Sequence, residues 1–194
     1  MSINLSKGGS INLSKEDPSL TQVIAGLGWD VNKYDTGTDF DLDASAFCLD
    51  ANDKCASEKD FVFYGATDHY SGAVKHMGDN RTGEGEGDDE QIMVDLTMVP
   101  DNINKIAFTV TIYEADKRGQ NFGQVQNAYI RLVNAVTGTE ICRCDLTEDF
   151  SFETAVVMGE LYKHNGTWKF KAIEAGFNGG LPALCGSYGL NAHE

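Results

Sequence analysis

Apolar and polar residues alternate along much of this chain, and that alternation is the feature that most limits its fold. The run from Val23 to Trp29 places an apolar side chain at every second position, and residues 92–96 and 106–112 follow the same period. Side chains on an extended strand point alternately to its two faces, so each run offers one face to a core. The pattern predicts β-strands.

Two further pairs of such runs are separated by turn sequences. Residues 128–134 and 140–146 flank Ala-Val-Thr-Gly, and residues 154–163 and 168–173 flank a turn containing His164-Asn-Gly166. Asn-Gly between two extended runs is a strong hairpin signal. Both pairs are therefore predicted to be antiparallel.

Helical signal is scarce and is confined to residues 114–119, a turn after Asp101 and residues 181–188. Roughly ten strands, with turn residues about every ten positions, favour antiparallel sheets over alternating βαβ units. We therefore predict an all-β protein, an antiparallel β-sandwich with a few short helices. No linker-like segment divides the chain, so residues 1–194 are expected to form a single domain.

The N-terminus carries a tandem repeat. Ser2-Ile-Asn-Leu-Ser-Lys-Gly-Gly9 is followed at once by Ser10-Ile-Asn-Leu-Ser-Lys-Glu-Asp17. A period of eight is too short for a solenoid unit. Because Ile and Leu alternate with polar residues on both sides of Gly8-Gly9, the repeat predicts two short strands joined by a turn.

The composition is strongly acidic, with 30 Asp and Glu against 15 Lys and Arg and a net charge of -15. Such a surface repels phosphate backbones and anionic headgroups, so we expect no direct nucleic-acid binding. The N-terminus has no apolar signal-peptide region, and no run of about 18 apolar residues occurs. These features predict a cytoplasmic protein with no transmembrane segment.

Five cysteines, an odd number, argue against a secreted disulfide framework and are expected to be free thiols. Cys142 and Cys144 form a Cys-x-Cys on a predicted strand. We interpret them as small buried hydrophobic residues rather than as a metal or redox pair, because no His or Cys lies at zinc-finger spacing from them.

The first of two acidic segments is Asp39-Phe-Asp-Leu-Asp-Ala-Ser45. Residues two apart on an extended chain share a face, so Asp39, Asp41 and Asp43 are expected to point the same way. Three neighbouring carboxylates repel one another unless a positive charge lies among them. The segment therefore favours cation binding.

The second acidic segment, residues 78–90, reads Gly-Asp-Asn-Arg-Thr-Gly-Glu-Gly-Glu-Gly-Asp-Asp-Glu. Its glycines allow the backbone to curl and to present carbonyl oxygens beside the carboxylates. Ca²⁺ takes six to eight such oxygens in flexible geometry, whereas Mg²⁺ needs a stricter octahedron. Ca²⁺ is therefore the predicted ion.

The acidic segments admit other interpretations. Residues 39–50 place acids at several EF-hand positions, but Ala44 stands where that loop needs Gly. Residues 83–87 lack the Lys of a phosphate-binding loop, and neighbouring acids would repel phosphate. A flexible, solvated acidic loop is the plain alternative, and the presence of two such segments argues against it.

Five motifs together resemble the TerD family of tellurite-resistance and general-stress proteins. They are Gly26-Leu-Gly-Trp-Asp30, Asp39-Phe-Asp-Leu-Asp-Ala-Ser45, the acidic run 78–90, Asn121-Phe-Gly-Gln-Val125, and Gly159-Glu-Leu-Tyr162 with Trp168-Lys-Phe170. The resemblance covers nearly the whole chain, so the single domain is expected to be TerD-like. It implies a calcium-binding β-sandwich of bacterial cytoplasm that is associated with resistance to tellurite, chemical damage or phage.

The same resemblance implies the calcium ligands, which combine side-chain and carbonyl oxygens. The side chains are those of Asp39, Asp41, Asp43, Asp79, Asn80, Glu84, Asp88, Asp89 and Glu90, and the carbonyls are those of Gly85 and Gly87.

Three functions remain at this stage. The first is a non-enzymatic, Ca²⁺-dependent interaction module that docks onto a protein partner or a membrane-associated stress complex. The second is a metal-dependent hydrolase acting on a phosphate or phosphodiester. The third is a thiol protein that consumes oxidant or tellurite. No isolated His or Lys stands beside the acidic segments in sequence, which favours the first.

Overall fold

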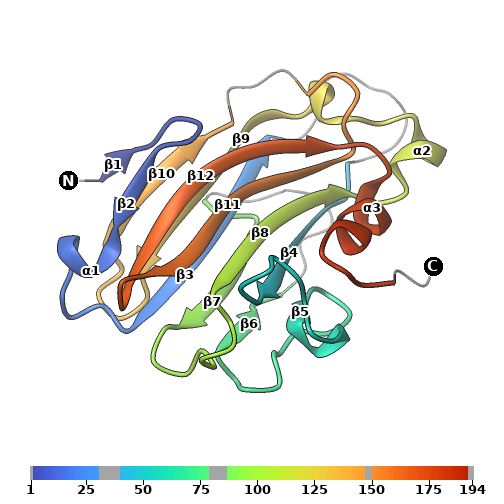
Figure 1. Cartoon of the computed structure of the whole chain (residues 1–194). Helices are drawn as coiled ribbons and strands as arrows, with labels where there is room; N and C mark the ends of the chain where they lie inside the picture. The colour runs from blue at the N-terminus through green and yellow to red at the C-terminus, as the bar shows by residue number, and fades with distance from the viewer. Residues whose placement is uncertain (1, 31–39, 79–86, 147–149, 192–194) are drawn as a thin grey trace.

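The structure is a computed structural model that describes residues 2–30, 40–78, 87–146 and 150–191. Two six-stranded sheets pack face to face (Figure 1). Sheet A runs in the order β1 (Ile3–Asn4), β10 (Glu140–Asp145), β9 (Gln126–Asn134), β3 (Gln22–Asp30), β7 (Glu90–Asp95), β6 (Val74–His76). Sheet B runs β2 (Ser10–Asn12), β12 (Thr167–Phe177), β11 (Ala155–His164), β8 (Lys105–Ile112), β4 (Leu42–Leu49), β5 (Phe61–Val62).

The strand pairs are antiparallel except for β1 with β10, which is parallel. The helical elements are short: α1 (Leu13–Glu16), η1 (Glu58–Asp60), α2 (Ala115–Arg118), η2 (Phe122–Gln124) and α3 (Gly180–Ser187). The predicted antiparallel β-sandwich with a few short helices is confirmed. In the described segments, no helix is long and apolar enough to cross a bilayer.

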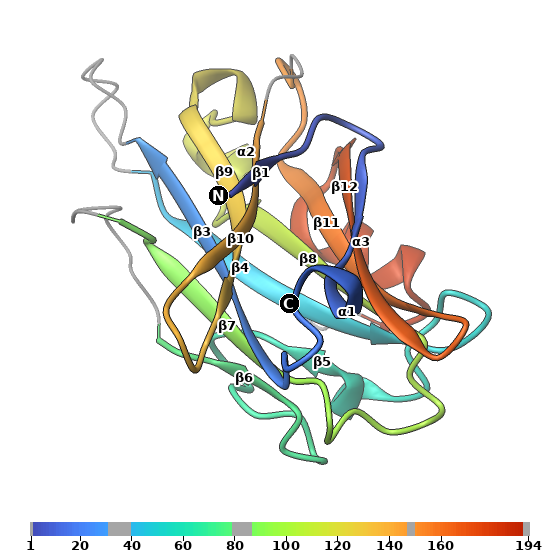
Figure 2. The same cartoon turned by 90° about the vertical axis from the view of Figure 1, so that its left-hand side faces the viewer.

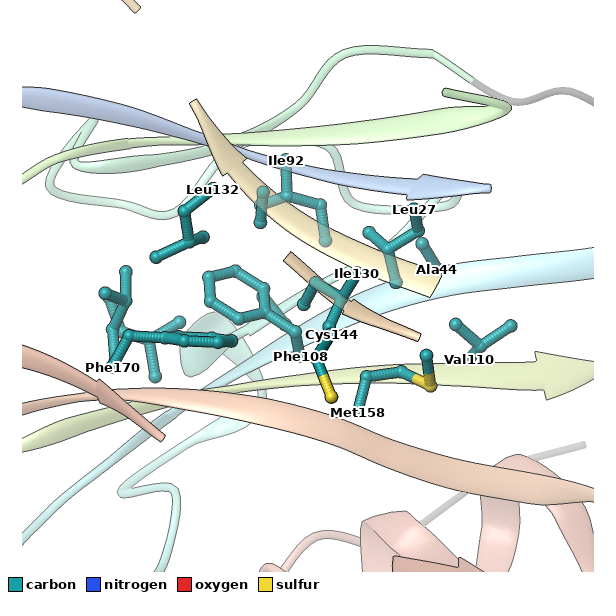
Figure 3. Packing of buried hydrophobic residues seen from close by; sticks show 14 of the residues in the cluster. Leu27, Ala44, Ile92, Phe108, Val110, Ile130, Leu132, Cys144, Met158 and Phe170 are labelled. Atoms are coloured by element: carbon teal, nitrogen blue, oxygen red, sulfur yellow. The ribbon is translucent and has the colours of Figure 1, made fainter. Parts of the chain in front are cut away.

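The alternation of the sequence becomes the core between the sheets. In β3, Val23, Ala25 and Leu27 are fully buried, and Ile92 and Val94 of β7 face the same way. Sheet B supplies larger side chains, including Phe108 and Phe170 (Figure 3). Full burial of one large apolar side chain contributes about 1.5–3 kcal/mol, so these positions fix which face of each strand points inward.

Strand β4 is buried along its whole length. Its even-numbered residues face the core between the sheets, whereas Phe47 and Leu49 join a second apolar cluster on the outer side of sheet B. Helix α3 covers that cluster through Leu184 and Cys185. The strand is therefore buried on both faces, although Asp43 and Ser45 make the first half of its outer face polar, and it leads directly out of the first acidic segment.

Both predicted hairpins are present. Strands β9 and β10 pair antiparallel, as do β11 and β12. At the β11–β12 turn, Asn165 and Gly166 both have positive φ, 51° and 73°. A type I′ turn requires this at both central residues, which is why Asn-Gly marks it.

The N-terminal repeat forms the two predicted short strands, but they do not pair with each other. Ile3 of β1 lies opposite Cys142 of β10, at the edge of sheet A. Ile11 of β2 lies opposite Phe170 of β12, at the edge of sheet B. The segment thus borders both layers (Figure 2). A two-stranded ribbon this short is unstable alone, and each strand gains more by completing an existing sheet edge.

Candidate metal centre

The predicted ligands divide into two groups. Asp39, Asp79, Asn80, Glu84 and Gly85 lie outside the described residues. Asp41, Asp43, Gly87, Asp88, Asp89 and Glu90 are described, and they flank the starts of β4 and β7.

Glu90 joins the two acidic segments. It is the first residue of β7, its side chain is buried between the sheets, and its Oε2 accepts a 2.6 Å hydrogen bond from the backbone amide of Ala44. Ala44 follows Asp43 directly, in the strand that leads out of the first acidic segment. Residues 46 positions apart are thus brought together where β4 and β7 approach each other.

His76 lies on the other side of the Glu90 carboxylate. Its Nε2 is 3.3 Å from Glu90 Oε2, although the N–H direction is not that of a hydrogen bond. The other ring nitrogen, Nδ1, accepts from the backbone amide of Gly78 at 3.3 Å, which places the proton of the neutral ring on Nε2. The Glu90 carboxylate thus has a hydrogen-bonded amide, that of Ala44, on one side and a ring nitrogen of His76 at 3.3 Å on the other.

Asp41 and Asp43 lie at the start of β4. The Asp41 carbonyl accepts a hydrogen bond from the amide of Tyr113, so the backbone pairing of β4 with β8 extends into the first acidic segment. Asp43 is buried and lies opposite Thr111 of β8, and two positions further along Ser45 bonds to Thr109 through their hydroxyls at 2.7 Å. The Asp43 carboxylate is therefore the first of a short row of polar side chains on β4 and β8, and it is carried by a paired strand.

Asp89 is held at the end of β3. Its amide donates to the Leu27 carbonyl, and its Oδ2 accepts from the amide of Trp29, both at 2.8 Å. Burial raises the pKa of the Asp89 carboxyl; the Trp29 hydrogen bond opposes this rise, and the nearby charges of Asp88 and Asp30 add to it. Negative charge is crowded at this position.

Asp88 is used differently. Its buried carboxylate lies on the outer face of sheet A, where Arg131 bonds to both oxygens through Nε at 2.7 Å and Nη2 at 3.1 Å. Tyr129 and Gln91 each donate a further hydrogen bond of 3.0 Å. Tyr129 Oη also donates to the carbonyl of Gly87 at 2.9 Å. The bond to Asp88 raises the pKa of Arg131, and burial raises that of Tyr129 to about 12.

Asp88 and Glu90 are two residues apart but do not share a face, because the chain bends over residues 87–89, before β7 begins. Glu90 points into the sandwich toward sheet B, whereas Asp88 points outward against Arg131 and does not meet it. Among the residues that the structure describes, no group of three or more His, Cys, Asp or Glu side chains is arranged to hold a metal ion by itself. The described residues supply carboxylates where the two acidic segments join β4 and β7.

Sequence reasoning missed several of these contacts. The Ala44 amide and the Arg131–Tyr129 pair lie 41 to 46 positions along the chain from the acids they contact. His76 lies two positions before the second acidic segment and beside Glu90, so the expectation that no His stands beside the acidic segments is wrong. Gly26 and Gly28 carried a signal for the Arg131–Tyr129 pair, because alternate glycines in a strand mark places where another group comes close to the backbone. A Cβ on Gly26 would lie 2.1 Å from Asp88 Oδ2, and one on Gly28 would lie 2.5 Å from the Tyr129 ring.

All five cysteines are free and buried, and burial had been predicted for Cys142 and Cys144. Burial raises the pKa of every one, to about 12 for Cys55, Cys142 and Cys144. Cys144 also lies 3.2 Å from the buried carboxyl group of Glu174, which disfavours a thiolate further. Nucleophilic and redox chemistry both need a thiolate, so this geometry argues against direct scavenging.

The fold and the site define an acidic β-sandwich protein, with carboxylates of two segments gathered where β4 and β7 begin. This description can be compared with known protein families. The TerD domain family matches residues 1–188. The chain is 56% identical to general stress protein 16U of Bacillus subtilis (strain 168) over 98% of both chains. It is 55% identical to the tellurium resistance protein TerD of an Alcaligenes species, over 99% of this chain and 100% of that one.

A solved structure, a TerD homologue from Streptomyces coelicolor A3(2), has the same fold. The TM-score is 0.69 at 22% identity, over 86% of this chain and 95% of that one. The chain belongs to the TerD family, whose named members include tellurium-resistance and stress proteins.

Proposed function

We propose that this protein is a cytoplasmic, calcium-binding stress-response protein of the tellurite-resistance type. It acts as a Ca²⁺-dependent interaction module rather than as a catalyst. Its partner is a protein or a membrane-associated stress complex that docks onto the calcium-loaded acidic segments.

The contact between Glu90 and Ala44 is the observation that carries this proposal. It brings the start of β7, the end of one acidic segment, against the start of β4, the end of the other. Asp43 and Glu90 are both buried, and burying carboxylates is costly unless positive groups compensate. The oxygen-only donor set of the two segments, with no thiol among the predicted ligands, fits a hard cation.

Four described carboxylates are candidate ligands, and they would hold the ion only with predicted ligands outside the described residues. The four are Asp41, Asp43, Asp89 and Glu90. Asp88 and the carbonyl of Gly87 serve to position the segment, because Arg131 and Tyr129 already engage them. Bound calcium would supply positive charge and join the two acidic segments.

The names of the relatives support the stress-response part of the proposal, since they include general stress and tellurium-resistance proteins. The net charge of -15 supports an ion-gated surface, because loading Ca²⁺ changes the local potential at the place where the acids gather.

Calorimetric titration of chelator-treated protein with Ca²⁺ and with Mg²⁺ tests the proposal, together with thermal unfolding. At ligand 100 times the dissociation constant, Ca²⁺ should stabilise the fold by about 2.7 kcal/mol if the unfolded chain does not bind it. Asp43→Asn should abolish most of that increment, whereas the exposed Asp68→Asn, which removes the same charge, should retain it. No heat and no stabilisation with Ca²⁺ would refute the proposal.

A further inference from the structure

One hexapeptide occurs twice in this chain and takes two different structures. Ser-Ile-Asn-Leu-Ser-Lys is found at residues 2–7, the first copy, and at residues 10–15, the second copy. The first copy contributes β1 and is otherwise non-helical, whereas the second copy begins as β2 and turns into α1.

The second copy packs along the edge of β12 and against the core beside it, and the surface that it covers is called the groove below. Ile11 is 6% exposed and Leu13 is fully buried. The Ser14 hydroxyl accepts a hydrogen bond from the amide of Trp168 at 3.2 Å, and Asn12 caps α1 by accepting from the Lys15 amide at 3.1 Å. All of these contacts are made by residues of the hexapeptide.

The first copy is held less extensively. Ile3, the counterpart of Ile11, is 37% exposed, and Leu5 is only partly buried where Leu13 is fully buried. Its two-residue strand is supplemented by a 2.8 Å bond from the Leu5 amide to the Arg143 carbonyl and by a bond from the Ser2 hydroxyl to Glu140.

We infer that the groove at the edge of β12 is a binding site for the hexapeptide Ser-Ile-Asn-Leu-Ser-Lys, and that residues 2–7 of the same chain are its second ligand. An eight-residue slip places Ile3 and Leu5 where Ile11 and Leu13 lie. Every side chain that contacts the groove from residues 10–15 is then replaced by an identical one.

The slip costs little conformational entropy. The connection to β3 grows from residues 16–21 to residues 8–21, and a loop lengthened about twofold closes only roughly three- to fourfold less often. Binding a second molecule instead would also cost translational and rotational freedom, which favours the copy in the same chain. The native register still dominates, because Gly8 and Gly9 cannot replace Glu16 and Asp17, and the 2.8 Å bond from Asn134 to Asp17 is lost.

The slipped register has a consequence for binding. It removes β1 from β10, so that backbone groups such as the Arg143 carbonyl become available at the edge of sheet A. An exposed strand edge accepts an extended segment of another protein. The duplicated hexapeptide thus allows one sheet edge to open while the edge of β12 stays covered.

Cross-linking tests the inference. In the native register, Ser10 and Lys171 are opposite and both are exposed. Slippage puts Ser2 in the place of Ser10, at a cross-strand distance that suits a disulfide. In full-length protein, Ser2→Cys with Lys171→Cys should therefore form an intramolecular disulfide slowly under mild oxidation. Ser10→Cys with Lys171→Cys is the matched control and should close rapidly.

Leu13→Ala provides the second arm, because it weakens the second copy and leaves Leu5 unchanged. It should raise the closure rate of the Ser2→Cys pair by roughly tenfold or more. If the Leu13→Ala variant does not fold, disulfide closure by the Ser2→Cys and Lys171→Cys pair in the otherwise unchanged chain still tests the inference. No closure at Ser2→Cys while the control closes fully would overturn the inference. A disulfide between two molecules, seen as a dimer on a non-reducing gel, would overturn the same-chain occupant.

Discussion

Gly26 faces the carboxylate of Asp88 on the outer face of sheet A, with no room for a side chain between them. Gly26 lies within β3, and Asp88 lies just before β7, in the second acidic segment. The glycine therefore does not serve a turn at this position. It lets the Asp88 carboxylate lie close against the sheet, within reach of Arg131.

Gly26→Ala should destabilise the protein by about 2–3 kcal/mol, because its Cβ would lie 2.1 Å from Asp88 Oδ2 and would displace a buried, hydrogen-bonded carboxylate. Urea unfolding measures the loss. Gly186→Ala is the matched control: this helical position is open, so the change should be neutral or slightly stabilising. Equal losses at the two positions would contradict the role given to Gly26.

Arg131→Met should cost about 2–3 kcal/mol, since it leaves the buried Asp88 carboxylate without its charged partner. Adding Asp88→Asn should recover part of that loss, because the uncompensated charge is gone. Lys117→Met breaks the exposed pair with Glu114 and should change stability by less than about 1 kcal/mol. A double-mutant cycle of chemical denaturation midpoints gives the coupling, and additive losses would show that the pair is not coupled.

Glu90→Gln separates the structural and ionic roles of Glu90. The amide retains an oxygen that can accept from the Ala44 amide, so the fold should persist by circular dichroism. The lost charge should remove most of the Ca²⁺-dependent rise in melting temperature. An unchanged rise would place the ion elsewhere.

The cysteines should resist alkylation in the folded protein. With a pKa of about 12, Cys142 and Cys144 are protonated at pH 8, and the reactive thiolate becomes appreciable only as the pH approaches that value. Iodoacetamide labelling followed by mass spectrometry should show little modification until denaturant is added. Rapid native labelling would revive the thiol hypothesis. Replacing Cys142 and Cys144 together by Ala should leave any Ca²⁺-dependent stabilisation unchanged.

The sequence by itself determined the strands and their inward faces. Side chains on a strand alternate between its two faces, so the positions of Val23, Ala25 and Leu27 predict which face of the strand packs against the core. It also determined the turn at Asn165-Gly166, because few other residue pairs accept two positive φ angles in succession. These are local properties, and the residues that decide them are neighbours in the chain.

The tertiary structure alone decided which groups meet. Asp88 and Glu90 belong to one acidic run, yet one bonds to Arg131 on the outer face and the other to Ala44 between the sheets. No local sequence pattern predicts that Asp88 contacts Arg131, 43 positions away, or that Glu90 contacts Ala44, 46 positions away. The hexapeptide repeat makes the same point most directly, since identical residues form an edge strand beside β10 in one copy and a strand followed by a helix beside β12 in the other. The hexapeptides are identical but their flanks are not, so the sheet edge that each copy borders and the residues that follow it, Gly8-Gly9 or Glu16-Asp17, together select the conformation.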